Sequence, residues 1–370
     1  MNAIERNTNF ARFTAGPVRY LKFFGILLQQ PEIPCSKYQR ILIVVTIALM
    51  FLHQIGYILE PGRTFAEQSA AAGLLNYTTV SGGKILFLVY NRRLLLRSHC
   101  QLAALYPSAA VERHYKLEHY LRIYAHVQTL LYNFFKYILI VYLTYPIMQS
   151  FYDLWSSGVY SYIMPTLFWY PVPLEQSLFC AAFIILSADL CLFSSVSQLM
   201  LHLDLLAQRI KELQPAEEGS LNALKSIIEY HQQILTIAKD VNSIFAPSIL
   251  FSLASSSFIL CFSAYQLLDD VSFVFALKVF LLLGYEMKQV VITCYYGDKL
   301  MDSSANLFTA VYAHNWTDGS PVYKRLVLFM MVRTYRPIAL NVAGISDVSL
   351  ITLKQVLSTA YQIFTVLKTT

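Results

Sequence analysis

The sequence predicts an all-α membrane protein with seven transmembrane helices. Hydrophobic residues make up 56% of its 370 residues and charged residues only 14%, whereas a soluble domain carries about 25% charged residues. The mean hydropathy is +0.49. The apolar residues are concentrated in seven ranges, each near the roughly 20 residues that a helix needs to span the hydrocarbon core. This composition excludes a soluble enzyme, a nucleic-acid-binding protein and a secreted disulfide scaffold.

The chain begins with a polar segment, residues 1–40, that we expect in the cytoplasm. Within it, residues 18–29 combine Arg19 and Lys22 with bulky apolar side chains, which predicts a helix lying in the membrane interface. Transmembrane helices one to four are expected within 41–201, five and six within 244–287, and the last within 348–370. The seven apolar ranges are 41–59, 67–90, 124–147, 176–201, 244–268, 271–287 and 348–367.

The segments that connect these ranges differ in character. Residues 148–175 contain several prolines and are expected to form an extracellular loop, whereas 202–243 and 288–347 are expected to be cytoplasmic helical segments. Within the last of these, residues 327–345 are apolar, but Arg333 and Arg336 would each cost about 2.5–3.5 kcal/mol at the bilayer centre. We therefore expect a buried or interfacial helix there and no eighth crossing.

Lysine and arginine residues indicate the orientation. The chain has 28 lysine and arginine residues, and four of them lie inside the apolar ranges. Only Arg63 and Lys368 lie in the connections on one side of the membrane, and all the others lie on the opposite side. The positive-inside rule places the basic side in the cytoplasm. Seven crossings then leave the N-terminus in the cytoplasm and the C-terminus outside, which is the reverse of a G-protein-coupled receptor.

Two charged residues lie at similar depths in the third and fourth apolar ranges. They are Lys136 and Asp189, and ionisable side chains inside a membrane are expensive and usually paired or functional. We therefore expect Lys136 and Asp189 to form an ion pair. Such a pair either fixes the packing of two helices or takes part in gating, and the first alternative is the more common.

A polar stripe marks the last apolar range. Its members recur at spacings of four, three, four and four residues, which places them on one helical face. They are Gln355, Thr359, Gln362, Val366 and Thr370. If several chains surround an axis with this face inward, they form a central pore lined by amides and hydroxyls, with Val366 as a hydrophobic ring. The alternative is that these groups form hydrogen bonds between neighbouring helices.

The outer halves of helices two, three, four and six offer a site for a small hydrophobic ligand. They combine apolar surface with a few hydroxyl groups, as small-molecule pockets do. A bundle interior that is merely rich in tyrosine is the alternative. The candidate ligand-binding residues are Leu74, Tyr77, Thr78, Ser81, Tyr137, Val141, Tyr145, Leu178, Ala182 and Phe273.

No motif supports catalysis or a cofactor. The six cysteines contain no C-x-x-C pair, and no zinc-protease, nucleophile-elbow or phosphate-binding motif is present. His114 and His119 lie near Glu112 and Glu118 but fit a solvated helix better than a reactive site. We therefore expect no enzyme activity, no metal, no cofactor and no nucleic-acid partner.

The last third of the chain carries a recognisable pattern. It runs from Tyr296-Gly297-Asp298 to Trp316, continues through Arg336-Pro337, and ends in Phe364-Thr365-Val366-Leu367. This pattern is similar to that of the insect odorant receptor family. Seven crossings, the chain length and a cytoplasmic N-terminus agree with the family along the whole chain.

The resemblance implies an odorant-gated, non-selective cation channel in the plasma membrane of a sensory neuron dendrite. It further implies a tetramer with a shared co-receptor, contacts through the cytoplasmic helices, and a central pore built from the last helix with Val366 at its gate. The segment 202–243 is much shorter than the corresponding segment of the co-receptor, so the chain resembles an odour-specific tuning subunit. The alternatives are a gustatory receptor of the same superfamily and, with less support, a G-protein-coupled receptor.

Overall fold

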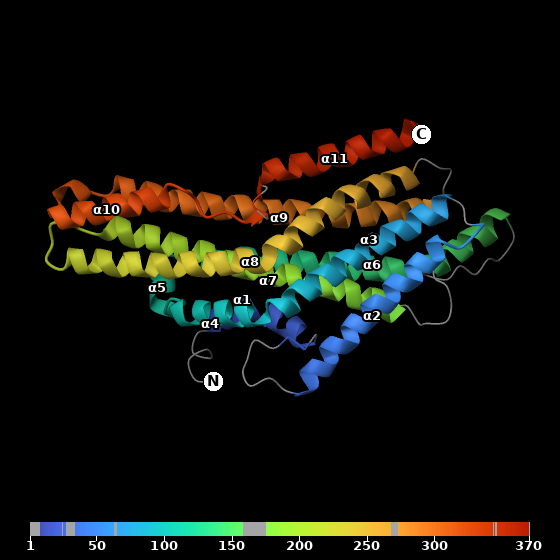
Figure 1. Ribbon diagram of the computed structural model, residues 1–370, viewed down its shortest axis with the longest axis horizontal. Coiled ribbons are helices and arrows are strands. Elements are labelled where there is room, and N and C mark those ends of the chain that lie inside the picture. Colours follow the sequence, from blue (N-terminus) through green and yellow to red (C-terminus); the bar gives the residue numbers. More distant parts are fainter. Residues whose placement is uncertain are drawn as a thin grey trace.

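The computed structural model describes residues 8–23, 25–26, 34–62, 65–157, 175–267, 273–342, 344 and 346–369. These residues form an elongated bundle in which the longest helices run along the long axis of the molecule (Figure 1). The helices are α1 (Thr8–Phe23), α2 (Pro34–Ile58), α3 (Phe65–Tyr90), α4 (Arg92–Leu105), α5 (Ala109–His114), α6 (Glu118–Ser157), α7 (Glu175–Glu212), α8 (Ser220–Gln266), α9 (Phe273–Ala313), α10 (Pro321–Thr334) and α11 (Leu350–Thr369). A short 3-10 helix, η2 (Trp316–Asp318), precedes α10, and two short strands, β1 (Asn341–Val342) and β2 (Ser346–Asp347), precede α11.

Each of the seven expected apolar ranges is occupied by a helix, in chain order α2, α3, α6, α7, α8, α9 and α11. A helix suits such ranges because it satisfies its backbone hydrogen bonds internally, which lipid cannot do. The prediction of a helical, membrane-type fold is therefore confirmed. Within the described residues, three stretches are long and apolar enough to cross a bilayer: Tyr38–Ile58, Phe183–Glu212 and Ser220–Gln266. The full count of seven crossings stays a prediction.

Several helices continue well beyond their apolar ranges. α7 ends at Glu212 and α8 begins at Ser220, so the segment 202–243 is the far end of a long helical hairpin. Its turn contains Gly219 with φ of +88°, a conformation that suits glycine. α6 continues to Ser157, so the first part of the expected loop 148–175 is helical; residues 158–174 lie outside the described part of the chain.

Residues 327–345 do not form one helix, contrary to expectation. α10 ends at Thr334 because Pro337 disfavours helical geometry in the residue before it and cannot donate a backbone hydrogen bond. The chain then forms the antiparallel pair of β1 and β2, with Val342 opposite Ser346. Val348 N donates to the Leu340 carbonyl at 2.8 Å. The short connection between α10 and α11 is therefore held by backbone hydrogen bonds.

The N-terminal helix α1 also differs from expectation. It begins at Thr8 and ends at Phe23, earlier than the expected range 18–29. Phe10, Phe13 and Leu21 are almost completely buried, and the helix packs on α6 and α7. Protein therefore covers the apolar face of α1, and the position of residues 18–29 in the membrane interface stays a prediction.

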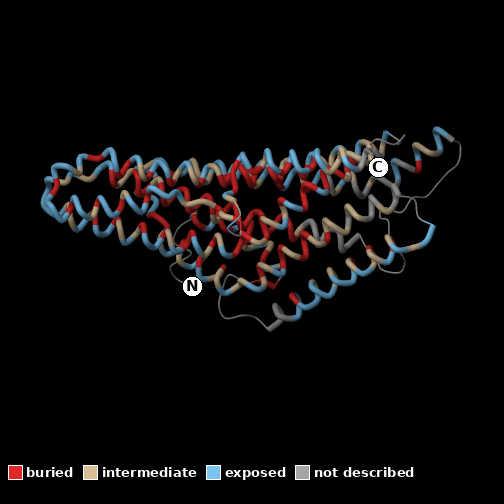
Figure 2. The backbone as a smooth tube through the Cα atoms, turned by 45° about the horizontal axis from the view of Figure 1, so that its top comes forward, coloured by how far each residue is buried: buried red, intermediate tan, exposed pale blue. Residues whose placement is uncertain are grey.

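The core of the bundle lies around α7. This helix contacts α1, α3, α6, α8 and α9, and most of Phe183–Glu212 is buried (Figure 2). By contrast, α2 lies at the edge of the bundle and exposes Leu42, Leu49 and Leu52. A long apolar face on an outer helix indicates contact with lipid or with another chain.

Candidate functional site

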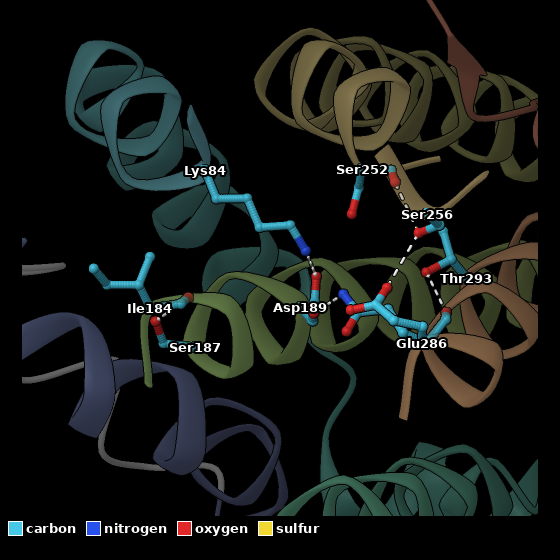
Figure 3. Close-up of polar contacts among 9 residues, drawn as sticks. Lys84, Ile184, Ser187, Asp189, Ser252, Ser256, Glu286 and Thr293 are labelled. Atoms are coloured by element: carbon cyan, nitrogen blue, oxygen red, sulfur yellow. Dashed lines mark hydrogen bonds and ion pairs between the residues drawn. The ribbon is translucent and has the colours of Figure 1, made fainter. Parts of the chain in front are cut away.

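An ion pair is buried between α3 and α7. Lys84 Nζ lies 2.6 Å from Asp189 Oδ1 (Figure 3), and the two side chains are 4% and 10% exposed. The predicted partner of Asp189, Lys136, is exposed on α6, so the Lys136–Asp189 pair is wrong. Similar depth in the sequence suggested Lys136, but the packing of α3 against α7 brings Lys84 to this carboxylate instead.

The pair belongs to a larger polar cluster in which four helices meet. Gln289 of α9 donates through Nε2 to Asp189 Oδ2. About one turn earlier, Glu286 accepts a hydrogen bond of 3.3 Å from Ser256 Oγ of α8. All these side chains are buried. A buried ion pair is tolerated when hydrogen bonds satisfy its remaining lone pairs, and Gln289 provides such a bond to Asp189.

Two small cavities border this cluster. One, of about 20 Å³, lies among α3, α7, α8 and α9 and is lined in part by Lys84 and Asp189. The other, of about 10 Å³, is lined by Tyr77, Glu286 and neighbouring apolar side chains. Both are lined by Ser252, Ser256 and Gln289. A cavity needs at least about 10–15 Å³ of such space to hold one water molecule, so the larger cavity has room for a water but not for an odorant.

The predicted ligand-binding residues are distributed over several surroundings. Tyr77 lines the smaller cavity. Thr78 and Ser81 are buried but serve helix packing: Thr78 Oγ1 accepts from Gln54 Nε2 of α2 at 2.9 Å, and Ser81 Oγ donates to the Thr78 carbonyl at 2.9 Å. Of these three, only Tyr77 lines either of the two cavities described above.

Of the other predicted ligand-binding residues, some lie nearer the surface and the others have side chains that the structure does not describe. Tyr137 and Phe273 are 64% and 74% exposed, and Val141 is half-buried. The structure therefore does not bring Tyr137 or Phe273 into a common pocket with Tyr77. The side chains outside the described part are those of Leu74, Tyr145, Leu178 and Ala182.

The sequence interpretation missed most of the polar cluster. Lys84 and Glu286 are charged residues inside apolar ranges, so each was detectable as an unusual buried ionisable group. Ser252 and Ser256 belong to a serine-rich stretch of the fifth range, which serine content alone does not distinguish from ordinary helix packing. Gln289 lies beyond the sixth range and carried no signal.

The polar stripe of α11 faces away from its own bundle. Val356 and Ala360, on the opposite side of the helix, are each 7% exposed, and α11 packs on α8 and α9. Thr370 lies outside the described residues. The described members of the stripe are all exposed: Gln355, Thr359, Gln362 and Val366.

Three consecutive serines of α8 contact three different helices. Ser256 reaches Glu286 of α9, as described above. Ser255 Oγ donates to Asn76 Oδ1 of α3. Ser257 Oγ donates to the Val356 carbonyl of α11 at 3.3 Å. The same turn of α8 therefore borders the smaller cavity and holds the backbone of α11.

Acidic and phenolic groups also meet where α1 approaches α5. Glu112 is fully buried and accepts hydrogen bonds from Asn9 Nδ2 at 2.8 Å and from Tyr106 Oη at 2.9 Å. Burial and the neighbouring Glu112 carboxylate raise the pKa of Tyr106, which therefore stays protonated and donates. These contacts fix α1 to the bundle. Within the described residues, no three histidine, cysteine or acidic side chains gather as a metal site.

Sequence and structure both resemble those of known receptors. A sequence profile described as 7tm odorant receptor matches residues 66–361. Odorant receptor 92a of Drosophila melanogaster is 24% identical over 98% of this chain and 95% of its own length. Odorant receptor 85c of the same organism is 25% identical over 82% of this chain and 83% of its own.

A solved structure shares the fold. The insect olfactory receptor OR5 from Machilis hrabei, in complex with eugenol, matches with a TM-score of 0.82 at 16% identity and covers both chains completely. The matched profile and both Drosophila relatives are odorant receptors, which favours this interpretation over a gustatory or G-protein-coupled receptor, and neither relative carries the name of a co-receptor. Because the profile covers most of its length, the chain belongs to the insect odorant receptor family.

Proposed function

We propose that the protein is the odour-specific subunit of an odorant-gated, non-selective cation channel. It assembles with a shared co-receptor into a heterotetramer in the plasma membrane of a sensory neuron. A volatile ligand binds among the outer halves of the helices, and α11 contributes to the central pore. The observation that carries this proposal is the exposed polar stripe of α11 in a member of the odorant receptor family.

The stripe supports a pore for a physical reason. Amide and hydroxyl groups such as those of Gln355, Thr359 and Gln362 are unfavourable against lipid, since lipid offers them no hydrogen bonds. Water or the matching face of another chain removes this cost. Val366, 62% exposed on the same face, then provides an apolar ring that closes the pore by excluding water.

The serines of α8 support a link between ligand and pore. A ligand that moves Ser255 or Ser256 at the cavity acts on the same turn that holds the α11 backbone through Ser257. The ligand opens the channel only to the extent that it binds the open arrangement better than the closed one. Modest affinity is expected because a small volatile molecule has few atoms to contribute.

Current recordings test the proposed function. Cells that express the chain together with an insect odorant co-receptor should give inward cation currents to some members of a volatile panel that includes eugenol, the ligand of the Machilis receptor. Cells that express either protein alone serve as controls for the response of this subunit. Currents from this chain alone would contradict the co-receptor assembly, and no current from any volatile would contradict the gating function.

The orientation of the chain is tested separately. Asn76 and Asn315 stand in glycosylation sequons, but Asn76 of α3 is bonded to Ser255 of α8, and Asn315 lies in a segment proposed to be cytoplasmic. Mass spectrometry should find no glycan on either. As a positive control, Val159→Asn creates an acceptor two residues before Ser161, in the proposed extracellular loop, and should be glycosylated. A glycan on Asn315 would reverse the proposed orientation.

A further inference from the structure

We propose that the larger cavity of the polar cluster binds the oxygen atom of a neutral, carbonyl-bearing volatile, such as a ketone, an aldehyde or an ester. The proposal rests on the proposed function and names the class of ligand for it; it places the oxygen atom of the ligand deeper than the outer halves of the helices, at the level of Lys84 and Asp189. It follows from the donors and acceptors that line the cavity, because a buried ligand must complement the groups left without partners.

The lining offers hydrogen-bond donors. Within the described residues, the Lys84 ammonium has one hydrogen-bond acceptor, Asp189 Oδ1, and an ammonium carries three N–H groups. The hydroxyls of Ser248 and Ser252 also line this cavity and have no hydrogen-bond partner in that part of the chain. A guest that accepts hydrogen bonds therefore finds several donors in one place.

The charged groups of the lining, Lys84 and Asp189, already contact each other. Asp189 Oδ1 receives the Lys84 ammonium, and Oδ2 receives the Gln289 amide. Glu286 Oε2 receives the Ser256 hydroxyl. An amine would thus compete with Lys84 and Gln289 for Asp189, and its ammonium would lie beside that of Lys84. A carboxylate ligand would lie beside Asp189 and Glu286. A neutral acceptor avoids both repulsions.

The carbon chain of such a ligand has a place beside the smaller cavity. Its lining includes the apolar side chains of Val80, Ile185 and Ile259. Because Ser252, Ser256 and Gln289 border both cavities, movement of these side chains joins the two spaces. Each space is now about the size of a water molecule or smaller, so a ligand enters only together with such a movement. Ligand entry is therefore coupled to a rearrangement of the turn of α8 that also holds α11.

A matched series of seven-carbon compounds tests the proposal: 2-heptanone, heptane, heptan-1-amine and heptanoate. In the complex with the co-receptor, 2-heptanone should be at least about tenfold more potent than the other three, since one or two hydrogen bonds are gained without repulsion. Ser252→Ala should lower the potency of 2-heptanone about fivefold and leave that of heptane unchanged. The readouts are current dose–response curves and the ligand-induced thermal shift of the purified complex.

Ser263→Ala is the matched control. Ser263 is buried on the same helix and its hydroxyl also has no partner in the described part of the chain, but it lines neither cavity. Equal effects of the two variants, or equal potency of heptane and 2-heptanone, would overturn the proposed subsite. A Ser252-dependent thermal shift without any current would retain the subsite and contradict the channel function. The absence of both a shift and a current would contradict both.

Discussion

Replacing Asp189 by alanine should destabilise the folded subunit by about 3–5 kcal/mol, because the Lys84 ammonium would remain buried without its carboxylate. The Lys84 side chain is only 4% exposed, so bulk water does not replace the lost contact. Gln289 would also lose the acceptor of its amide. The measurement is the thermal unfolding of the detergent-solubilised protein, followed by size-exclusion fluorescence, with surface expression as a second readout.

Lys136→Ala provides the control for this prediction. Lys136 is exposed on α6, so its removal should change stability by no more than about 0.5 kcal/mol. The double variant Lys84→Met with Asp189→Leu should recover part of the loss, because apolar side chains of similar volume often replace a buried pair well. Recovery should be incomplete because Gln289 keeps an unpaired amide. Equal losses for Lys136→Ala and Asp189→Ala would contradict the observed pairing.

Gly297→Ala should destabilise the folded subunit by about 3 kcal/mol. A Cβ atom at Gly297 of α9 would lie 2.1 Å from the carbonyl oxygen of Val348, far inside van der Waals contact. Val348 cannot easily retreat, since it is fully buried and its N–H is bonded to the Leu340 carbonyl. Overpacking typically costs about 1–3 kcal/mol, and we expect the upper end because the clash is with backbone. The measurements are surface expression and thermal unfolding.

A second glycine of the same helix is the control. Gly284 is exposed on α9, and a Cβ atom there would meet nothing within 4 Å. Gly284→Ala should therefore be neutral or stabilising by about 0.5–1 kcal/mol, the difference between alanine and glycine in a helix. If Gly297→Ala is tolerated as well as Gly284→Ala, the close approach of Val348 to α9 is not a feature of the folded protein.

The positions of the long helices could be predicted from the sequence, but their ends could not. Apolar composition reveals a helix only where it meets lipid or a continuous core. Where α7, α8 and α9 continue beyond the apolar ranges, they become amphipathic. A count of apolar residues therefore no longer identifies the helix there, and its end is missed. The break of α10 at Thr334 was signalled by Pro337, although the apolar run on both sides of it suggested one helix.

The partners of charged residues were less predictable for a geometric reason. Sequence position gives the depth of a residue in a crossing but not which neighbour its helix faces. From the sequence, either Lys84 or Lys136 could pair with Asp189. The ion pair forms with Lys84 because α3 packs against α7. The stripe of α11 was predictable as a single face because its spacing depends on one helix alone. In the sequence, Gly297 stood out only as part of a family pattern. The reason that this position requires glycine could not be predicted, because the Val348 carbonyl oxygen that packs against it is distant in sequence.

The length of α8 has a mechanical consequence. Its 47 residues extend for about 70 Å at 1.5 Å per residue, whereas the hydrocarbon core is about 30 Å thick. α8 contains Pro247 and bends along its length (Figure 1), but its length is still more than twice the thickness of the core. In the proposed orientation the Ser220 end of α8 lies in the cytoplasm, so a displacement of α8 beside a bound ligand would reach a region far from that ligand. Substitutions at the Ser220 end of α8 should then alter the ligand sensitivity of the proposed channel without contacting the ligand, as measured by current dose–response curves.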